Sequence, residues 1–336
     1  TEAPLAALGE LGAVVGNEGF VAAFLEQALR ACCAFTAKVV ATAEEADAHW
    51  SRVQGGVGLL RLCALPRLLH LFRALPPGAT DAFAAKADAA TKDAYERLLT
   101  AKLTTLPQQT QAALPTRLGG CGMLRFRGLL EQAWLGSWLQ ALPAVRELAG
   151  PSVASQEVIE SGDAGWAASL RQALDDLADE GVHLDHAGAV SREPPAAAWA
   201  WGDEAPALAH RQRLLSRSRH EAVRDRLLRA LPDGARARFR ACGGAGAGAW
   251  LLAAPTAVAT RLTDLEFKVA ARLRLRIPLH LGGSADRCRN RRSGDSGEEQ
   301  PAGGQGGECS KLLDADGFHA LTCLVGGLVI RRHHSL

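Results

Sequence analysis

Hydrophobic residues recur at helical spacing near the start of the chain. Between Gly19 and Val40 apolar side chains return every three or four positions, which places them on one face of a helix. That face consists of Val21, Phe24, Leu25, Ala28, Leu29 and Cys32. Asn17 stands just before the pattern, where an N-cap residue is favoured. The pattern predicts a long amphipathic helix.

A second apolar pattern, VGLLRLCALPRLLHLFRALPPG, contains a proline in its middle. Because proline has no N–H for an interior helical turn, Pro66 either kinks one helix or begins a new one. The prolines and glycine at 76–78 end the stretch. Its predicted buried stripe is Leu59, Leu62, Cys63, Leu69, Phe72 and Leu75. A third predicted helix, Thr80 to Leu103, buries Phe83, Ala87, Ala90, Ala94 and Leu98.

A glycine-rich segment, LPTRLGGCGMLRF, leads into an apolar helix that carries Trp134 and Trp138 one turn apart. Glycine-rich turns before helices can hold phosphate. The spacing of Gly119, Gly120 and Gly122 matches neither the P-loop nor the dinucleotide pattern, and no clear strand precedes it. The pattern favours a tight turn that docks a helix.

Residues 150–207 are rich in Ala, Gly and Pro and predict a variable linker with one amphipathic helix, around Trp166–Ala178. In that helix Asp175 and Asp176 form a carboxylate pair on the face opposite Leu170, Leu174 and Leu177. This placement indicates a solvated face rather than a catalytic pair.

Basic residues are concentrated in the second half of the chain. Residues 211–292 hold 19 Arg and Lys against six Asp and Glu, whereas the whole chain has a net charge of +2. Such a separation of charge points to an anionic partner, although a solvated helix face accounts for the same arginines nearly as well. Within RLRLRIPL, an extended chain places Arg272, Arg274 and Arg276 on one side and a helix splays them around the axis.

Composition limits the fold and the compartment. The single Tyr and the few Ile argue against a large β architecture, because strands favour aromatic and β-branched residues, and they favour a mainly α protein. Eight scattered Cys suggest a reducing compartment rather than a disulfide framework. We expect no membrane span, because the longest uncharged run, 241–260, is glycine-rich, and no targeting signal is evident. The chain begins without Met, so we expect it to be part of a longer protein.

The last 28 residues bring cysteine and histidine together. With the preceding Glu308 they read ECSKLLDADGFHALTCLVGGLVIRRHHSL. Zinc prefers thiolate and imidazole ligands in a tetrahedron, and Cys309, His319 and Cys323 supply three of them. The fourth ligand is either Cys288, across a polar insert at 284–308 that we expect to be disordered, or His333. The alternative is a small buried hairpin in which each cysteine acts as a hydrophobic residue.

Several segments together resemble the region that follows the polymerase palm in non-LTR-retrotransposon-type reverse transcriptases, especially those of algae and dinoflagellates. The similar segments occur in the family's order: LLRLCALPRLLHLFRALPP, LPTRLGGCGMLRF with AWLGSW, GAWLLAAPT with DLEFKVAARLRLRIPL, and the Cys/His segment with RRHHSL. The resemblance implies a helical thumb-like region at 1–149, the linker at 150–207, a basic helical connector at 208–283, the insert at 284–308, and a Cys/His knuckle with the start of a truncated nuclease-like region at 309–336.

The resemblance also implies functional residues. It places Cys288, Cys309, His319 and Cys323 on the structural zinc knuckle and Arg332 with His333 on an Arg-His pair. The sequence departs from the family pattern at two places. The 284–308 insert separates two cysteines that usually lie close together, and His334 replaces the usual Asn. Polymerisation requires carboxylates that hold two metal ions, typically an aromatic-x-Asp-Asp turn, and the chain contains no such turn.

The leading hypothesis is therefore a zinc-containing, non-catalytic segment that binds RNA or DNA and works with a polymerase domain that the chain lacks. The expected phosphate contacts are Arg213, Arg217, Arg224, Arg272, Arg274, Arg276 and Arg332. The family would imply a nuclear protein. One alternative is a helical scaffold, or a decayed retroelement product, without a ligand. Another is a hydrolase that uses His319 or His333 with an Asp, for which no nucleophile motif is present.

Overall fold

The computed structural model describes residues 18–45, 51–64, 66–150, 156–161, 165–185, 189–195 and 210–279, together with Cys309, Lys311 and His319. These residues are mainly helical, as the composition predicts. The chain divides into two compact units after Asp264. The predicted domain limits stay a prediction, and the insert at 284–308 lies outside the described residues.

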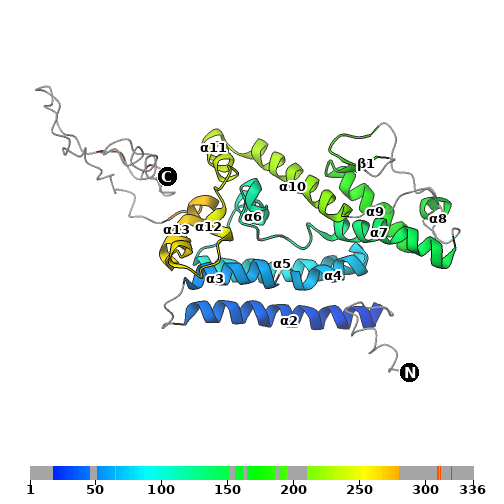
Figure 1. Cartoon of the computed structure of the whole chain (residues 1–336), viewed down its shortest axis with the longest axis horizontal. Coiled ribbons are helices and arrows are strands. Elements are labelled where there is room, and N and C mark those ends of the chain that lie inside the picture. The colour runs from blue at the N-terminus through cyan, green and yellow to red at the C-terminus, as the bar shows by residue number, and fades with distance from the viewer. Residues whose placement is uncertain are drawn as a thin grey trace, which may run out of the picture. The chain divides into compact units, whose positions relative to one another are not determined.

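The first unit contains nearly all of the described helices (Figure 1). Their bounds are α2 Glu18–Glu44, α3 Arg52–Leu59, α4 Pro66–Ala74, α5 Pro77–Leu99, α6 Leu106–Ala113, α7 Leu130–Ala149, α8 Gln156–Ser161, α9 Gly165–Asp179, α10 Arg211–Ala230, α11 Asp233–Cys242 and α12 Ala249–Leu252. A π-helix, Leu60–Ala64, joins α3 to α4, and short 3₁₀ turns occupy Thr116–Leu118 and Val258–Thr260. The second unit contains α13, which spans Asp264–Leu275 and begins at the boundary.

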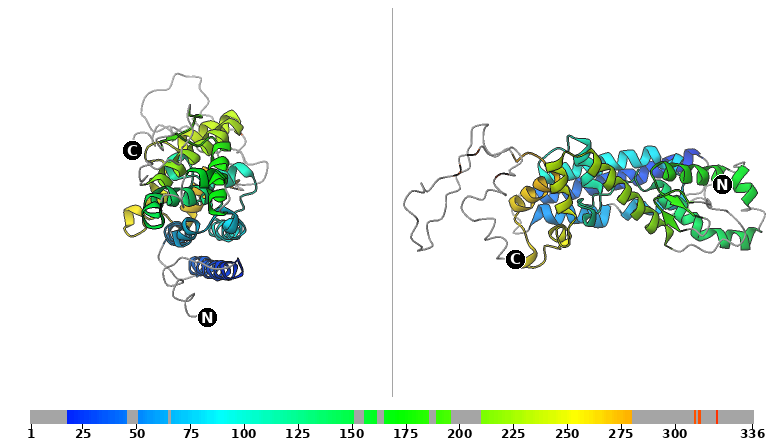
Figure 2. Two further views of the ribbon diagram at one scale, coloured as in Figure 1. Left: turned by 90° about the vertical axis from the view of Figure 1, so that its right-hand side faces the viewer. Right: turned by 90° about the horizontal axis from the view of Figure 1, so that it is seen from above.

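The helices of the first unit stack in layers. The helix α2 packs along α5, α4 and α5 pack against α7, and α7 packs against α9 and α10 (Figure 2). The core between the first layers includes Leu25 and Leu29 of α2 together with Phe72, Phe83 and Phe126. Phe72 lies between the other two rings, with centroid distances of 5.9 and 5.5 Å. The periodic apolar face predicted for residues 19–40 is therefore the face that α2 buries.

The second apolar pattern folds differently from the prediction. Pro66 begins a new helix, which is one of the two expected outcomes. The predicted buried positions Leu59 and Leu62 are 46% and 72% exposed, whereas Leu60 and Ala64 are fully buried. The reason is the π-helix between α3 and α4, because its i→i+5 turn rotates the side chains away from the 3.6-residue period. The prediction for Leu59 and Leu62 was therefore wrong.

Residues 156–195, predicted as part of a linker with one helix, contain two helices and a hairpin. The predicted helix is α9, and its Asp175 is exposed as expected. The strands β1, His183–Leu184, and β2, Val190–Ser191, pair antiparallel. The apolar residues of these two helices and the hairpin share a core with α7. This core includes Trp134, Leu135, Leu139, Leu142, Ile159, Leu170, Leu177, Val182 and Leu184. Trp138 of α7 stacks on Trp166 of α9 with ring centroids 4.6 Å apart.

The glycine-rich segment is a tight turn, as the spacing favours. A Cβ atom on Gly120 would lie 1.9 Å from the carbonyl oxygen of Leu114 and 2.6 Å from that of Gln111. The turn is held from both sides, since the N–H of Gly122 donates to Leu114 at 2.9 Å and the amide of Gln111 donates to Gly119 at 3.1 Å. The glycines therefore allow close backbone packing after α6, and the chain then continues extended toward α7.

Two helical stretches, Glu18–Glu44 and Arg52–Ala74, are long and apolar enough to cross a membrane by length and composition alone. Core helices of soluble proteins meet the same criterion. In this structure α2 packs on α3 and α5, and α4 packs on α7.

Candidate nucleic-acid interface and Cys/His contact

The basic helix α10 is placed by a close crossing with α7. Gly136 lies at the crossing, and a Cβ atom there would come within 2.7 Å of the backbone of Gln212. The first half of α10 buries Leu215 and Ser218 toward this crossing. The second half buries Leu227 in a separate core with Leu114, Leu118, Leu231 and Phe239. Leu215 and Leu227 therefore anchor α10 to two different core clusters.

The three predicted phosphate contacts on α10 share one side of the helix. At 3.6 residues per turn, positions 213, 217 and 224 lie within about 40° of one another around the axis. Arg213 is exposed, and the side chains of Arg217 and Arg224 are 64% and 37% exposed. Arg217 pairs with Glu221 at 3.0 Å and Arg224 with Asp225 at 2.8 Å. In the part of the chain that the structure describes, no carboxylate pairs with Arg213.

The other predicted arginines belong to the second unit. The helical alternative for 272–276 is correct up to Leu275, and Arg276 follows in a left-handed turn with φ of 56°. Arg274 is buried and Arg272 is half-buried. The helix thus spreads these arginines around its axis instead of aligning them. Arg332 lies outside the described residues.

Sequence reasoning missed a buried ion cluster on the inner side of α10. Arg219 donates from its Nη1 to Glu131 of α7 at 2.8 Å and also pairs with Glu180, which follows α9. Arg226 lies 3.7 Å from the same Glu180. Burial raises the pKa of Glu131, and the charge of Arg219 offsets part of that rise. No local signal distinguishes Arg219 from the neighbouring arginines, since only the packing of α7 and α9 determines which of them turns inward.

Two of the predicted zinc ligands meet in the second unit. The Sγ of Cys309 lies 3.2 Å from the Nε2 of His319, and Cys309 is buried. Two ligands of one tetrahedral zinc with ordinary Zn–S and Zn–N lengths are separated by about 3.5 Å, so the pair has a suitable spacing. A thiol–imidazole hydrogen bond has a similar distance. Cys288, Cys323 and His333 lie outside the described residues, among which no group of three potential metal ligands occurs.

Comparison with models of known families, with curated proteins and with solved structures gives no match to this chain.

Proposed function

We propose that this chain is a nucleic-acid-binding segment of a non-LTR-retrotransposon-type reverse transcriptase, from the region that follows the palm. The observation that carries the proposal is the basic side of α10, formed by Arg213, Arg217 and Arg224. It belongs to a stretch, residues 211–242, with ten Arg and only three acidic residues. The order of the family-like segments supports the same assignment.

Phosphate groups can compete for these arginines. Exposed ion pairs such as Arg217–Glu221 contribute only about 0–1 kcal/mol each, because water and salt screen them. Arg213 pairs with no carboxylate in the described part of the chain, so no ion pair has to break before it contacts a phosphate. A backbone phosphate of RNA or DNA therefore gains a charge-assisted hydrogen bond at little cost. The bound strand would be shared with a polymerase domain, since this chain lacks an aromatic-x-Asp-Asp turn.

The test is a salt titration of binding to labelled duplex DNA and to an RNA–DNA hybrid, followed by fluorescence anisotropy. We expect binding at low salt and a steep loss of affinity as salt rises, with about 0.9 in the logarithmic slope for each phosphate contacted on duplex DNA. The triple variant Arg213→Gln, Arg217→Gln, Arg224→Gln should reduce that slope by about 2–3.

A matched control removes three exposed cations elsewhere: Arg30→Gln, Lys86→Gln and Arg97→Gln, on α2 and α5. Both triple variants change the net charge equally, so a general charge effect would weaken them alike. Equal weakening, or no binding of the unmutated protein at low salt, would contradict the proposal and leave a helical scaffold without a ligand as the better account.

The proposal includes a structural zinc in the second unit. The 3.2 Å approach of Cys309 and His319 supports it, because thiolate and imidazole are ligands that zinc prefers. Cys323 and either Cys288 or His333 would complete a closed tetrahedron, which holds a small module together without taking part in chemistry.

Zinc content of the purified protein, measured by plasma emission spectrometry, tests this part. We expect about one zinc per chain, lost in Cys309→Ala and in Cys323→Ala. Cys242→Ala, which removes a half-buried cysteine of the first unit, is the control and should keep the metal. Zinc-free unmutated protein, or full zinc in the Cys309→Ala variant, would show that the cysteine and histidine form an ordinary hydrogen bond instead.

A further inference from the structure

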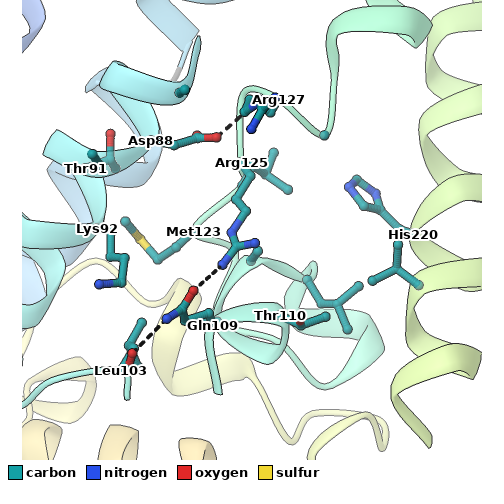
Figure 3. A pocket seen from close by; sticks show the side chains of 18 of the residues that line it. Asp88, Thr91, Lys92, Leu103, Gln109, Thr110, Met123, Arg125, Arg127 and His220 are labelled. Atoms are coloured by element: carbon teal, nitrogen blue, oxygen red, sulfur yellow. Dashed lines mark hydrogen bonds between the residues drawn. The ribbon is translucent and has the colours of Figure 1, made fainter. Parts of the chain in front are cut away.

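A cavity of about 670 Å³ lies in the first unit. It is bounded by α5, by α6, by the extended segment after the glycine turn (residues 123–127) and by α10. Its volume falls in the range of about 300–1,000 Å³ that is usual for small-molecule sites. Part of its wall is apolar and includes Met123, Leu124 and Val223. Polar side chains from all of these elements face the same space (Figure 3).

Most charged groups around the cavity are already paired. Arg127 makes two hydrogen bonds to Asp81, at 2.6 and 2.8 Å. Lys92 pairs with Glu96 at 2.8 Å. The carboxylates nearest α10 belong to the cluster of Arg219. These pairs leave little charge available to a ligand.

Asp88 is also engaged, although by backbone groups. Its two oxygens accept the N–H groups of Phe126 at 2.6 Å and of Arg127 at 3.2 Å. Burial raises the pKa of Asp88, and these hydrogen bonds and the nearby arginine charges offset part of that rise. Asp88 therefore anchors the extended segment rather than neutralising a cation by direct pairing.

Arg125 is the exception among the described cations that line the cavity. Its Nη2 donates to the neutral amide oxygen of Gln109 at 3.0 Å, and no carboxylate pairs with it within the described residues. The guanidinium has five N–H donors, so most of its hydrogen-bonding capacity is available. In Figure 3 its side chain extends into the space between α5, α6 and α10.

Arg125 is also held in place before any ligand arrives. The Nε2 of the same Gln109 amide donates to the carbonyl oxygen of Leu103 at 2.9 Å, and this hydrogen bond orients the amide. The backbone is fixed on both sides of Arg125, since Met123 donates to Ala112 at 3.0 Å and Phe126 donates to Asp88. A preorganised arginine loses less entropy on binding an anion than a free surface arginine does.

We propose that this cavity binds a nucleotide, with its phosphate on Arg125 and its base against the apolar wall. A planar guanidinium matches phosphate geometry, and the half-buried side chains of Leu124 and Val223 give the wall apolar surface for a flat ring. The choice of a nucleotide rests on the proposed function, because α10, which lines the cavity, also carries the arginines assigned to nucleic acid. The nucleotide is either free in solution or part of the bound strand.

His220 gives the cavity a neutral hydrogen-bonding group on the α10 side. Burial, with the charges of Arg117 and Arg219, lowers its pKa to about 4. The imidazole is therefore uncharged near neutral pH and offers one donor and one acceptor to a base or a sugar hydroxyl.

Calorimetric titration of the full chain with AMP, UMP and adenosine tests the proposal. We expect both monophosphates to bind and adenosine to bind at least about tenfold more weakly, because it lacks the charge-assisted contacts. Arg125→Met should weaken monophosphate binding at least about tenfold. Gln109→Glu should do the same by a different route, since a carboxylate would then pair with Arg125 where the neutral amide now does.

Arg30→Gln on α2 is the control and should leave monophosphate binding unchanged within about twofold, because Arg30 is exposed and does not line the cavity. Unfolding curves of the two cavity variants establish that they are folded. A short single-stranded RNA distinguishes a free nucleotide from a nucleotide of the bound strand. If the protein binds the RNA but not the monophosphates, and Arg125→Met loses the RNA binding, the ligand is a nucleotide of the strand.

Monophosphate and RNA binding that is absent, or that survives both Arg125→Met and Gln109→Glu in folded protein, would overturn the proposal. The unmutated protein separates the two proposals. If it binds monophosphates but no duplex, the proposed function alone has failed. If it binds duplex but neither monophosphates nor single-stranded RNA, the cavity proposal alone has failed.

Discussion

Replacing Arg219 by Met should destabilise the first unit by about 3 kcal/mol or more, because it leaves Glu131 without its cation and Glu180 with only the more distant Arg226. The side chains of Arg219 and Glu131 are only 13% and 14% exposed, and Glu180 is 27% exposed. These carboxylates come from α7 and from the end of α9, so their mutual repulsion would push these two elements apart. Equilibrium denaturation in urea, followed by circular dichroism, measures the loss.

Arg217→Met is the matched control on the same helix. Its ion pair with Glu221 is exposed, so its removal should cost less than about 1 kcal/mol. Adding Glu131→Gln to the Arg219→Met variant should restore part of the lost stability, since one of the two uncompensated charges disappears. Similar losses for Arg219→Met and Arg217→Met would contradict the assignment of a buried cluster.

Gly120→Ala should destabilise the first unit by about 3 kcal/mol or more, at the upper end of what overpacking causes. The new methyl group would overlap the carbonyl groups of Leu114 and Gln111. Backbone atoms cannot rotate aside as a long side chain does, and the carbonyl of Leu114 is already bonded to Gly122. The turn would have to open, and the segment that carries Arg125 would shift with it.

Gly234→Ala is the control for this substitution. Gly234 lies in the first turn of α11, and no atom stands within 4 Å of a Cβ placed there. Alanine favours the helix over glycine by up to about 1 kcal/mol, so this variant should be neutral or slightly more stable. Urea denaturation of both variants makes the comparison. A Gly120→Ala variant as stable as the unmutated chain would show that the turn is not tightly packed.

If both predictions hold, the same contacts that stabilise the fold also set the shape of the cavity. The turn at Gly120 begins the extended segment that presents Arg125, and the Arg219 cluster holds α10 over the opposite wall. Monophosphate binding by folded variants at these two places would therefore report on the shape of the cavity, whereas Arg125→Met reports on the contact with phosphate.

Local periodicity was sufficient for the regular helices. The apolar faces of α2 and α9 follow a 3.6-residue repeat, and each buries the stripe that the repeat predicts. The same reasoning failed at Leu59 and Leu62, because a π turn breaks the repeat and periodicity assumes an unbroken α-helix. The apolar content of residues 156–195 was too dispersed to reveal that they share a core with α7.

The sequence alone determined that the protein is mainly helical, that α10 is basic and that Cys309 and His319 are candidate metal ligands ten residues apart, because composition and short-range spacing express these properties directly. Only the tertiary structure decided which arginine is buried at Glu131, and that Arg125 faces a cavity and pairs with no carboxylate among the described residues. An arginine looks the same in any sequence window. Its role depends on partners that lie tens of residues away along the chain, and folding alone brings them within hydrogen-bonding distance.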